Sequence, residues 1–88
     1  MRLTRHAERR STERRVPRDV IRLIQDFGTA YRSGGAEGLK LDRTAIDLAS
    51  EGDHRLRADL RRYRGAYVIV SDEGTVITVA RETRRHCR

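Results

Sequence analysis

The segment between Pro17 and Gly28 restricts the fold most, because its pattern fits an amphipathic helix and little else. Its large apolar residues recur at the spacing of one helical face, at Val20, Ile21, Leu23, Ile24 and Phe27. Proline suits the first turn of a helix, and glycine favours a left-handed position just beyond the last turn. We therefore expect a helix from Pro17 to a left-handed Gly28, with one face that needs an apolar surface to cover.

Two apolar runs near the end of the sequence can supply that surface. Residues 66–71 and 75–81 flank Asp72-Glu73-Gly74, which is typical of a tight β-hairpin connection. Both runs are continuously apolar in part, a pattern that favours central strands covered on both faces. An earlier hairpin is indicated by two extended segments, 29–32 and 37–41, around Ser33-Gly34-Gly35.

Three further helices are expected from their capping residues. Thr4 can cap a first helix that runs to about Arg14, and its low apolar content predicts a helix on the surface or along one edge. Asp42 and Asp53 can cap two short helices later in the chain. The second of these carries apolar residues on one face and arginines on the other.

These elements predict one domain, residues 1–88, of the α+β class. The expected order is two N-terminal helices, a β-hairpin, two short helices and a C-terminal β-hairpin, around a small and mainly antiparallel sheet. A chain of 88 residues with 36% hydrophobic residues has a modest core. Reinforcement by a homodimer is therefore an open expectation.

The charge balance points to an acidic partner. Twenty basic residues against thirteen acidic ones give a net charge of +7, which suits nucleic-acid phosphate, an anionic membrane surface or an acidic protein. Lys40 is the only lysine. Arginine is suited to phosphate, but a GC-rich genome also replaces lysine by arginine without a functional cause. That alternative accounts for the choice of arginine and leaves the excess of charge unexplained.

The remaining composition argues for an unmodified intracellular protein. Cys87 is the only cysteine, so no intrachain disulfide can form. No apolar stretch approaches the length of a membrane span. The three histidines and the cysteine have no metal-ligand spacing, and there is no phosphate-binding loop. We expect a cytoplasmic protein without a metal, a cofactor or a membrane partner.

One spacing in the first predicted helix suggests a site. His6, Arg10 and Arg14 recur every four residues and share a stripe, with Arg9 beside it. The alternative is a solvated face, on which the arginines form weak exposed pairs with Glu8 and Glu13. The sequence pattern by itself leaves both interpretations open.

Two runs resemble an uncharacterised bacterial domain family. HAERRSTERRVP is similar to its opening signature His-Ala-x-x-Arg-x-x-x-Arg-Gly-(Ile/Val), with Arg15 at the glycine position. AYVIVSDEGTVITVARETRR resembles its closing hairpin and basic exit. That family is similar in layout to toxins of the BrnT and RelE type, in which helices pack on a small antiparallel sheet.

The resemblance implies metal-independent RNA cleavage, in which the ribose 2′-OH attacks the neighbouring phosphate. This reaction needs a base, an acid and cations for the developing charge. The resemblance assigns His6 to acid–base work and Arg10 and Arg14 to phosphate. Position in the closing hairpin adds three phosphate-binding candidates, Arg81, Arg84 and Arg85, and Arg9 of the first helix is a fourth. Glu82 and Tyr67 are further catalytic candidates. An acidic antitoxin is the implied protein partner.

Two other functions stay open on the sequence. The first is a non-catalytic binding module for nucleic acid or for an acidic protein, and the second is a plain interaction protein or dimer. The sequence has three tyrosines, one phenylalanine and no tryptophan, so it predicts contact with phosphate more than stacking on bases.

Overall fold

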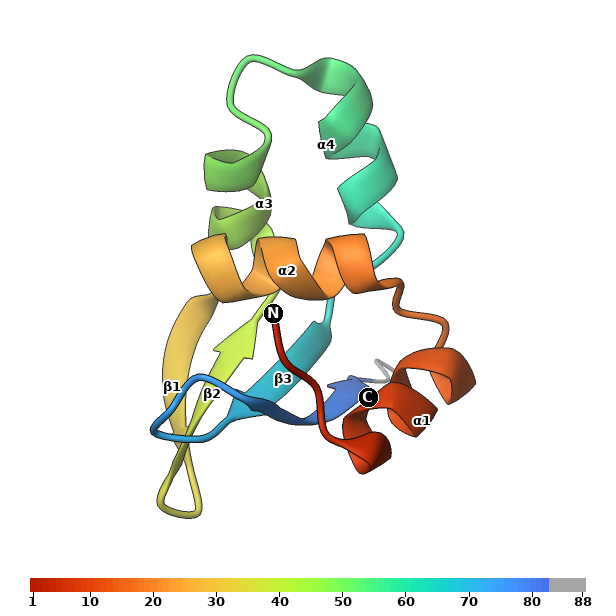
Figure 1. Ribbon diagram of the computed structural model, residues 1–88. Helices are drawn as coiled ribbons and strands as arrows, with labels where there is room; N and C mark the ends of the chain where they lie inside the picture. The colour runs from red at the N-terminus through yellow and green to blue at the C-terminus, as the bar shows by residue number, and fades with distance from the viewer. Residues whose placement is uncertain (83–88) are drawn as a thin grey trace, which may run out of the picture.

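The computed structural model describes residues 1–82 and has the predicted α+β architecture, with helices and strands in the expected order (Figure 1). The elements are α1 (Arg5–Glu13), α2 (Arg18–Phe27), β1 (Thr29–Ser33), β2 (Ala36–Lys40), α3 (Arg43–Ala49), α4 (His54–Arg61), β3 (Ala66–Val70) and β4 (Val76–Arg81). The four strands form one antiparallel sheet in the order β1-β2-β3-β4.

The helices begin where their capping residues predict. The side chain of Thr4 accepts a hydrogen bond from the Ala7 amide at the start of α1. Asp42 does the same for α3 and Asp53 for α4. Each cap satisfies an amide that the first helical turn leaves without a partner, which fixes the start of the helix.

The core lies between α2 and one face of the sheet. Ile21 and Ile24 of α2 are fully buried, as is Val68 of β3. Helix α1 packs along β4 and contributes the buried Ala7. Helices α3 and α4 form a pair beyond α2, at the opposite end of the molecule from the turn between β1 and β2 (Figure 1). We call the sheet surface that packs on α2 the core face, and the opposite surface the open face.

The expected left-handed conformation at Gly28 is wrong. Gly28 is extended, with φ −62° and ψ 151°. A side chain is excluded here by crowding, because a Cβ atom would lie 2.5 Å from the carbonyl oxygen of Ile24. The glycine therefore lets the chain turn directly from α2 into β1 without a left-handed residue.

The prediction that the last two strands are central is confirmed for β3, which lies between β2 and β4, and is wrong for β4. The prediction that both strands are covered on both faces is also wrong. Strand β4 is the last strand in the sheet order, and only residues 2–4 run beside its free edge, through a bridge between Leu3 and Val76. Ile69 is half-buried, and Ile77 is 38% exposed at an irregularity in the β3–β4 pairing. Consecutive apolar residues in these strands reflect one covered face and isolated apolar side chains on the other.

The connection between α1 and α2 contains a left-handed residue. Arg15 has φ 56°, and it is the single non-glycine residue with positive φ among residues 1–82. A left-handed conformation is costly for a residue with a Cβ atom. Val16 follows and is fully buried, so the turn at Arg15 brings the chain back into the core.

Candidate functional site

Strand alternation gathers a group of polar and aromatic side chains on the open face. Tyr31 lies opposite Gly38, and Lys40, two residues further along β2, lies opposite Tyr67. Residues that face each other across a strand pair project to the same side of the sheet, as do residues two apart on one strand. We call Tyr31, Lys40, Tyr67 and Glu82 the open-face cluster.

The two tyrosines are in contact. Their ring centroids are 6.3 Å apart at an interplanar angle of 72°, an edge-to-face arrangement. The ring of Tyr31 lies directly over Gly38, where a Cβ atom would come within 2.3 Å of it. The ammonium group of Lys40 is 5.6 Å from the centroid of Tyr31, within the range of a cation–π contact. Glycine at 38 therefore leaves room for the Tyr31 ring to lie on the sheet.

The environment of Tyr31 keeps its phenol protonated. Burial raises the pKa of Tyr31 above 10.0, and the nearby Tyr67 and Glu82 raise it further. At neutral pH the hydroxyl is therefore a hydrogen-bond donor. A donor on an aromatic surface suits an acceptor such as a phosphate or base oxygen.

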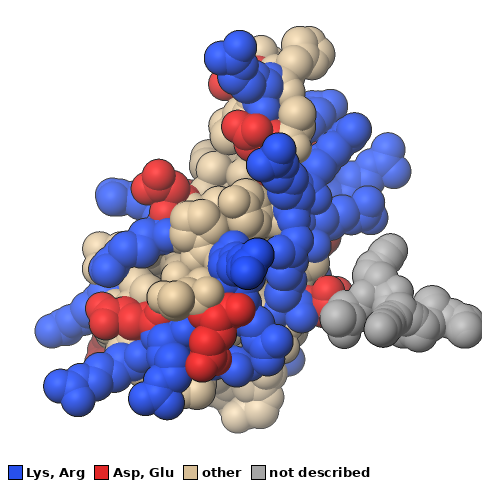
Figure 2. Space-filling view, turned by 90° about the vertical axis from the view of Figure 1, so that its right-hand side faces the viewer, with Lys and Arg blue, Asp and Glu red and all other residues tan. Residues whose placement is uncertain are grey.

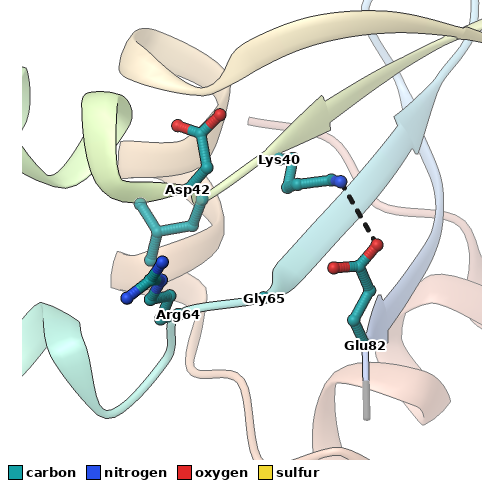
Figure 3. A pocket seen from close by; sticks show the side chains of 6 residues that line it. Lys40, Asp42, Arg64, Gly65 and Glu82 are labelled. Carbon is teal, nitrogen blue, oxygen red and sulfur yellow. Dashed lines mark ion pairs between the residues drawn. The ribbon is translucent and has the colours of Figure 1, made fainter. Parts of the chain in front are cut away.

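A pocket adjoins the cluster at the end of β2. It has a volume of about 440 Å³ and is lined by Lys40, Leu41, Asp42, Arg64, Gly65 and Glu82. Lys40 Nζ and a Glu82 carboxylate oxygen are 3.2 Å apart across one side of the pocket, and Arg64 lies on the other side (Figure 3). The pocket thus has two cations from different elements around a partly apolar floor.

His6 reaches the same face from the side of β4. Its Nε2 atom shares a hydrogen bond of 3.1 Å with the Thr78 hydroxyl. Thr78 pairs with Ile69, and Tyr67 pairs with Ala80, so Thr78 and Tyr67 are diagonal neighbours on the sheet. Diagonal neighbours are typically about 7–8 Å apart. The imidazole therefore stands at the border of the cluster, as an exposed acid–base group.

The arginines of the predicted stripe do not converge on this cluster. Arg10 is held by Glu13 of its own helix at 3.2 Å. Arg9 and Arg14 are exposed, and Arg14 is the C-cap of α1. This arrangement fits the alternative of a solvated helix face for the arginines, and leaves His6 as the member of the stripe that contacts the sheet.

Arg81 points to the other side of β4. Its guanidinium donates to the carbonyl oxygen of Arg62 and lies 5.8 Å from the centroid of the Tyr63 ring, both at the end of α4. Thr78 projects to the open face, so the structure does not bring Arg81 and His6 together in one site. The predicted phosphate-binding residues Arg84 and Arg85 lie outside the described residues.

Sequence reasoning missed Tyr31 and Lys40. Their role depends on β2 pairing with β3, which joins segments separated by two helices. A signal was present in the alternation of Gly38 and Lys40 with Leu39, which marks one strand with two different faces. Tyr67 and Glu82, named from the hairpin's position, do belong to the cluster.

The chain has no significant match among protein-family models, curated proteins or solved structures. Within residues 1–82, no helix is long and apolar enough to span a membrane.

Proposed function

We propose that this protein binds single-stranded RNA on the open face of its sheet. The observation that carries the proposal is the contact between Tyr31 and Tyr67 on an uncovered sheet surface, with Lys40 beside them. Exposed aromatic rings on a sheet stack against unpaired bases, and each stacked base contributes about 1–3 kcal/mol. The net charge of +7 supports attraction to the phosphate backbone.

The pocket beside the cluster is a place for the phosphates of the bound strand. Bases against the tyrosines would leave phosphates near Lys40 and Arg64, on either side of the pocket. Lys40 is paired with Glu82, so binding replaces one partner of the lysine by another. The exposed carboxylate then returns to water at little cost, because surface ion pairs contribute about 0–1 kcal/mol.

The salt dependence of RNA affinity tests the proposal. Fluorescence anisotropy with a labelled single-stranded RNA is expected to give an affinity that falls steeply with salt, and Lys40→Gln should reduce the log–log slope by about 0.7. Arg22→Gln removes the same charge from an exposed position on α2 and is the control for a change in overall charge. An affinity that is independent of salt, or a slope unchanged by Lys40→Gln, would contradict RNA binding at this place.

Cleavage of the bound RNA is a second proposal, favoured by the position of His6. The histidine lies at the border of the cluster through its bond to Thr78, and an imidazole is a common general acid or base in catalysis. In the reaction, the 2′-oxygen forms a bond to phosphorus while the 5′-oxygen leaves with a proton, which gives a 2′,3′-cyclic phosphate and a 5′-hydroxyl. Tyr67 and Glu82 are further acid–base groups on the same face.

Product analysis separates cleavage from binding. Incubation of RNA with the protein in EDTA should release 2′,3′-cyclic phosphate ends, and His6→Gln should lower the rate by about 100-fold or more with RNA affinity retained. Intact RNA after incubation, with RNA binding demonstrated, would leave the non-catalytic binding module as the function.

An acidic protein that covers the open face is the partner implied by an antitoxin-like system, and the cytoplasm is the location that this function requires. Such a partner should compete with RNA for Lys40 and Arg64. Competition in the anisotropy assay, lost in Lys40→Gln, is the expected result.

A further inference from the structure

A second basic site lies between α3 and α4, away from the open-face cluster. The two helices enclose a cleft of about 390 Å³, lined by Arg43, Ile46, Asp47, Arg57, Arg61 and Arg64. Figure 2 views the side of the molecule that carries α1 and α4, and shows basic side chains over its whole height. The residues come from both helices and from the turn that follows α4, so the cleft depends on how the pair packs.

The cleft carries four guanidinium groups and one carboxylate. Arg57 is held in place, since it lies 3.7 Å from Asp47 and its Nε donates to the hydroxyl of Ser50 at 3.5 Å. Ser50 is itself buried and donates to the carbonyl oxygen of Ile46. Asp47, the acidic residue of the cleft, is thus already paired with Arg57.

Three arginines of the cleft have no acidic partner. Arg43, Arg61 and Arg64 form no ion pair with any other of residues 1–82. Like charges that line one cleft repel each other, and an anion between them removes that repulsion. The guanidinium fork matches the oxygens of phosphate and bonds to them in pairs.

The number of unpaired cations in the cleft favours more than one phosphate. A single phosphate group engages one or two arginine forks and leaves the rest of the cations unbalanced. Arg64 also lines the pocket beside the open-face cluster, so the cleft and that pocket share one wall. Arg64 therefore connects the unpaired arginines of the cleft to the pocket beside the sheet.

We propose that the α3–α4 cleft binds a chain of two or more linked phosphate groups. The ligand is either a free oligophosphate, including that of a nucleotide, or the phosphorylated end of an RNA. The cleft does not depend on the tyrosines or on His6, and of its arginines only Arg64 is shared with the RNA site on the open face. Arg43 and Arg61 therefore distinguish this inference from RNA binding on the open face.

Calorimetry with tripolyphosphate tests the cleft directly. Tripolyphosphate should bind at least about tenfold more tightly than inorganic phosphate at equal ionic strength, and Arg61→Gln should weaken it about tenfold, because the variant loses a charge-assisted hydrogen bond. Arg55→Gln removes the same charge from α4 outside the cleft lining and should change the affinity less than about twofold, since surface charges interact weakly at physiological salt.

Two further arms identify the source of the phosphates. RNA with a 5′-triphosphate should bind more tightly than the same RNA with a 5′-hydroxyl if the ligand is an RNA end, and Arg61→Gln should abolish the difference. Equal binding of both RNAs, with tripolyphosphate still specific for the cleft, assigns the site to a free oligophosphate. Absence of tripolyphosphate binding, or equal losses in Arg61→Gln and Arg55→Gln, overturns the proposal.

Discussion

The two faces of the sheet are made from the same strands, yet they have opposite compositions. The core face carries Val68 and Val79, which are fully buried against the helices. The open face carries Tyr31, Lys40 and Tyr67 at alternate positions of the same or neighbouring strands. One face is a packing surface, and the other carries aromatic, cationic and hydrogen-bonding groups.

The difference shows that only one face of the sheet packs against α2. Half of each strand is enough to bury the apolar face of α2, so the alternate half is free for other chemistry. A change on the core face should therefore affect folding, and a change on the open face should affect binding. The predictions below test that separation, from the largest expected effect to the smallest.

The largest loss of stability is expected on the core face. Ile21→Ala removes a side chain that is 0% exposed and should lower the free energy of unfolding by about 2–5 kcal/mol, from lost burial and the cavity left behind. Ile77→Ala, at 38% exposure, should cost less than about 1 kcal/mol because little apolar area is lost. Urea unfolding followed by circular dichroism measures both, and equal losses would contradict the placement of the core between α2 and the sheet.

A smaller loss of stability is expected at Gly38, under the Tyr31 ring on the open face. Gly38→Ala places a methyl group where the Tyr31 ring lies, so the ring must move, at a cost of about 1–3 kcal/mol. The move breaks the contact with Tyr67 and should return the pKa of Tyr31 toward 10.0. Absorbance titration of the tyrosines measures this shift. A pKa of Tyr31 that stays raised in the variant would contradict it.

The raised pKa of Tyr31 also sets a direction for stability against pH. The folded state holds the neutral phenol more strongly than the unfolded state, so this contribution is complete below the unfolded pKa of about 10. It is lost as the pH rises through the higher folded pKa. In Tyr31→Phe this part of the alkaline loss should disappear in urea titrations carried out over the same pH range.

The smallest effect is a gain in stability at Arg15. Its φ of 56° favours glycine, which is also the residue that the resembled signature has at this position. Arg15→Gly should raise the free energy of unfolding by about 0.5–1 kcal/mol through relief of backbone strain. Arg14→Gly is the control, since Arg14 is right-handed with φ −92° and should gain nothing.

Local patterns predicted most of the fold. The caps at Thr4, Asp42 and Asp53 and the two hairpin turns lie where the sequence indicates them, because each depends on residues close in the chain. The position of β4 at the edge was not predictable, since strand order depends on contacts between distant segments.

The candidate site was predictable only in part, for the same reason. His6, Tyr67 and Glu82 were named from two ends of the sequence. Tyr31 joins them only through pairing of β1 with β2 and of β2 with β3. A tyrosine beside a glycine-rich turn carries no sign of a ligand until its strand neighbours are known.

The most direct test of the account is RNA affinity after removal of the two aromatic rings of the open-face cluster. Tyr31→Leu/Tyr67→Leu should lower the affinity for single-stranded RNA by about tenfold or more, because each stacked base contributes about 1–3 kcal/mol. Phe27→Leu removes an aromatic ring that is 42% exposed on α2 and should leave the affinity unchanged. Circular dichroism of each variant reports that it is folded. An equal affinity in the double variant and the control would contradict the open face as the binding surface.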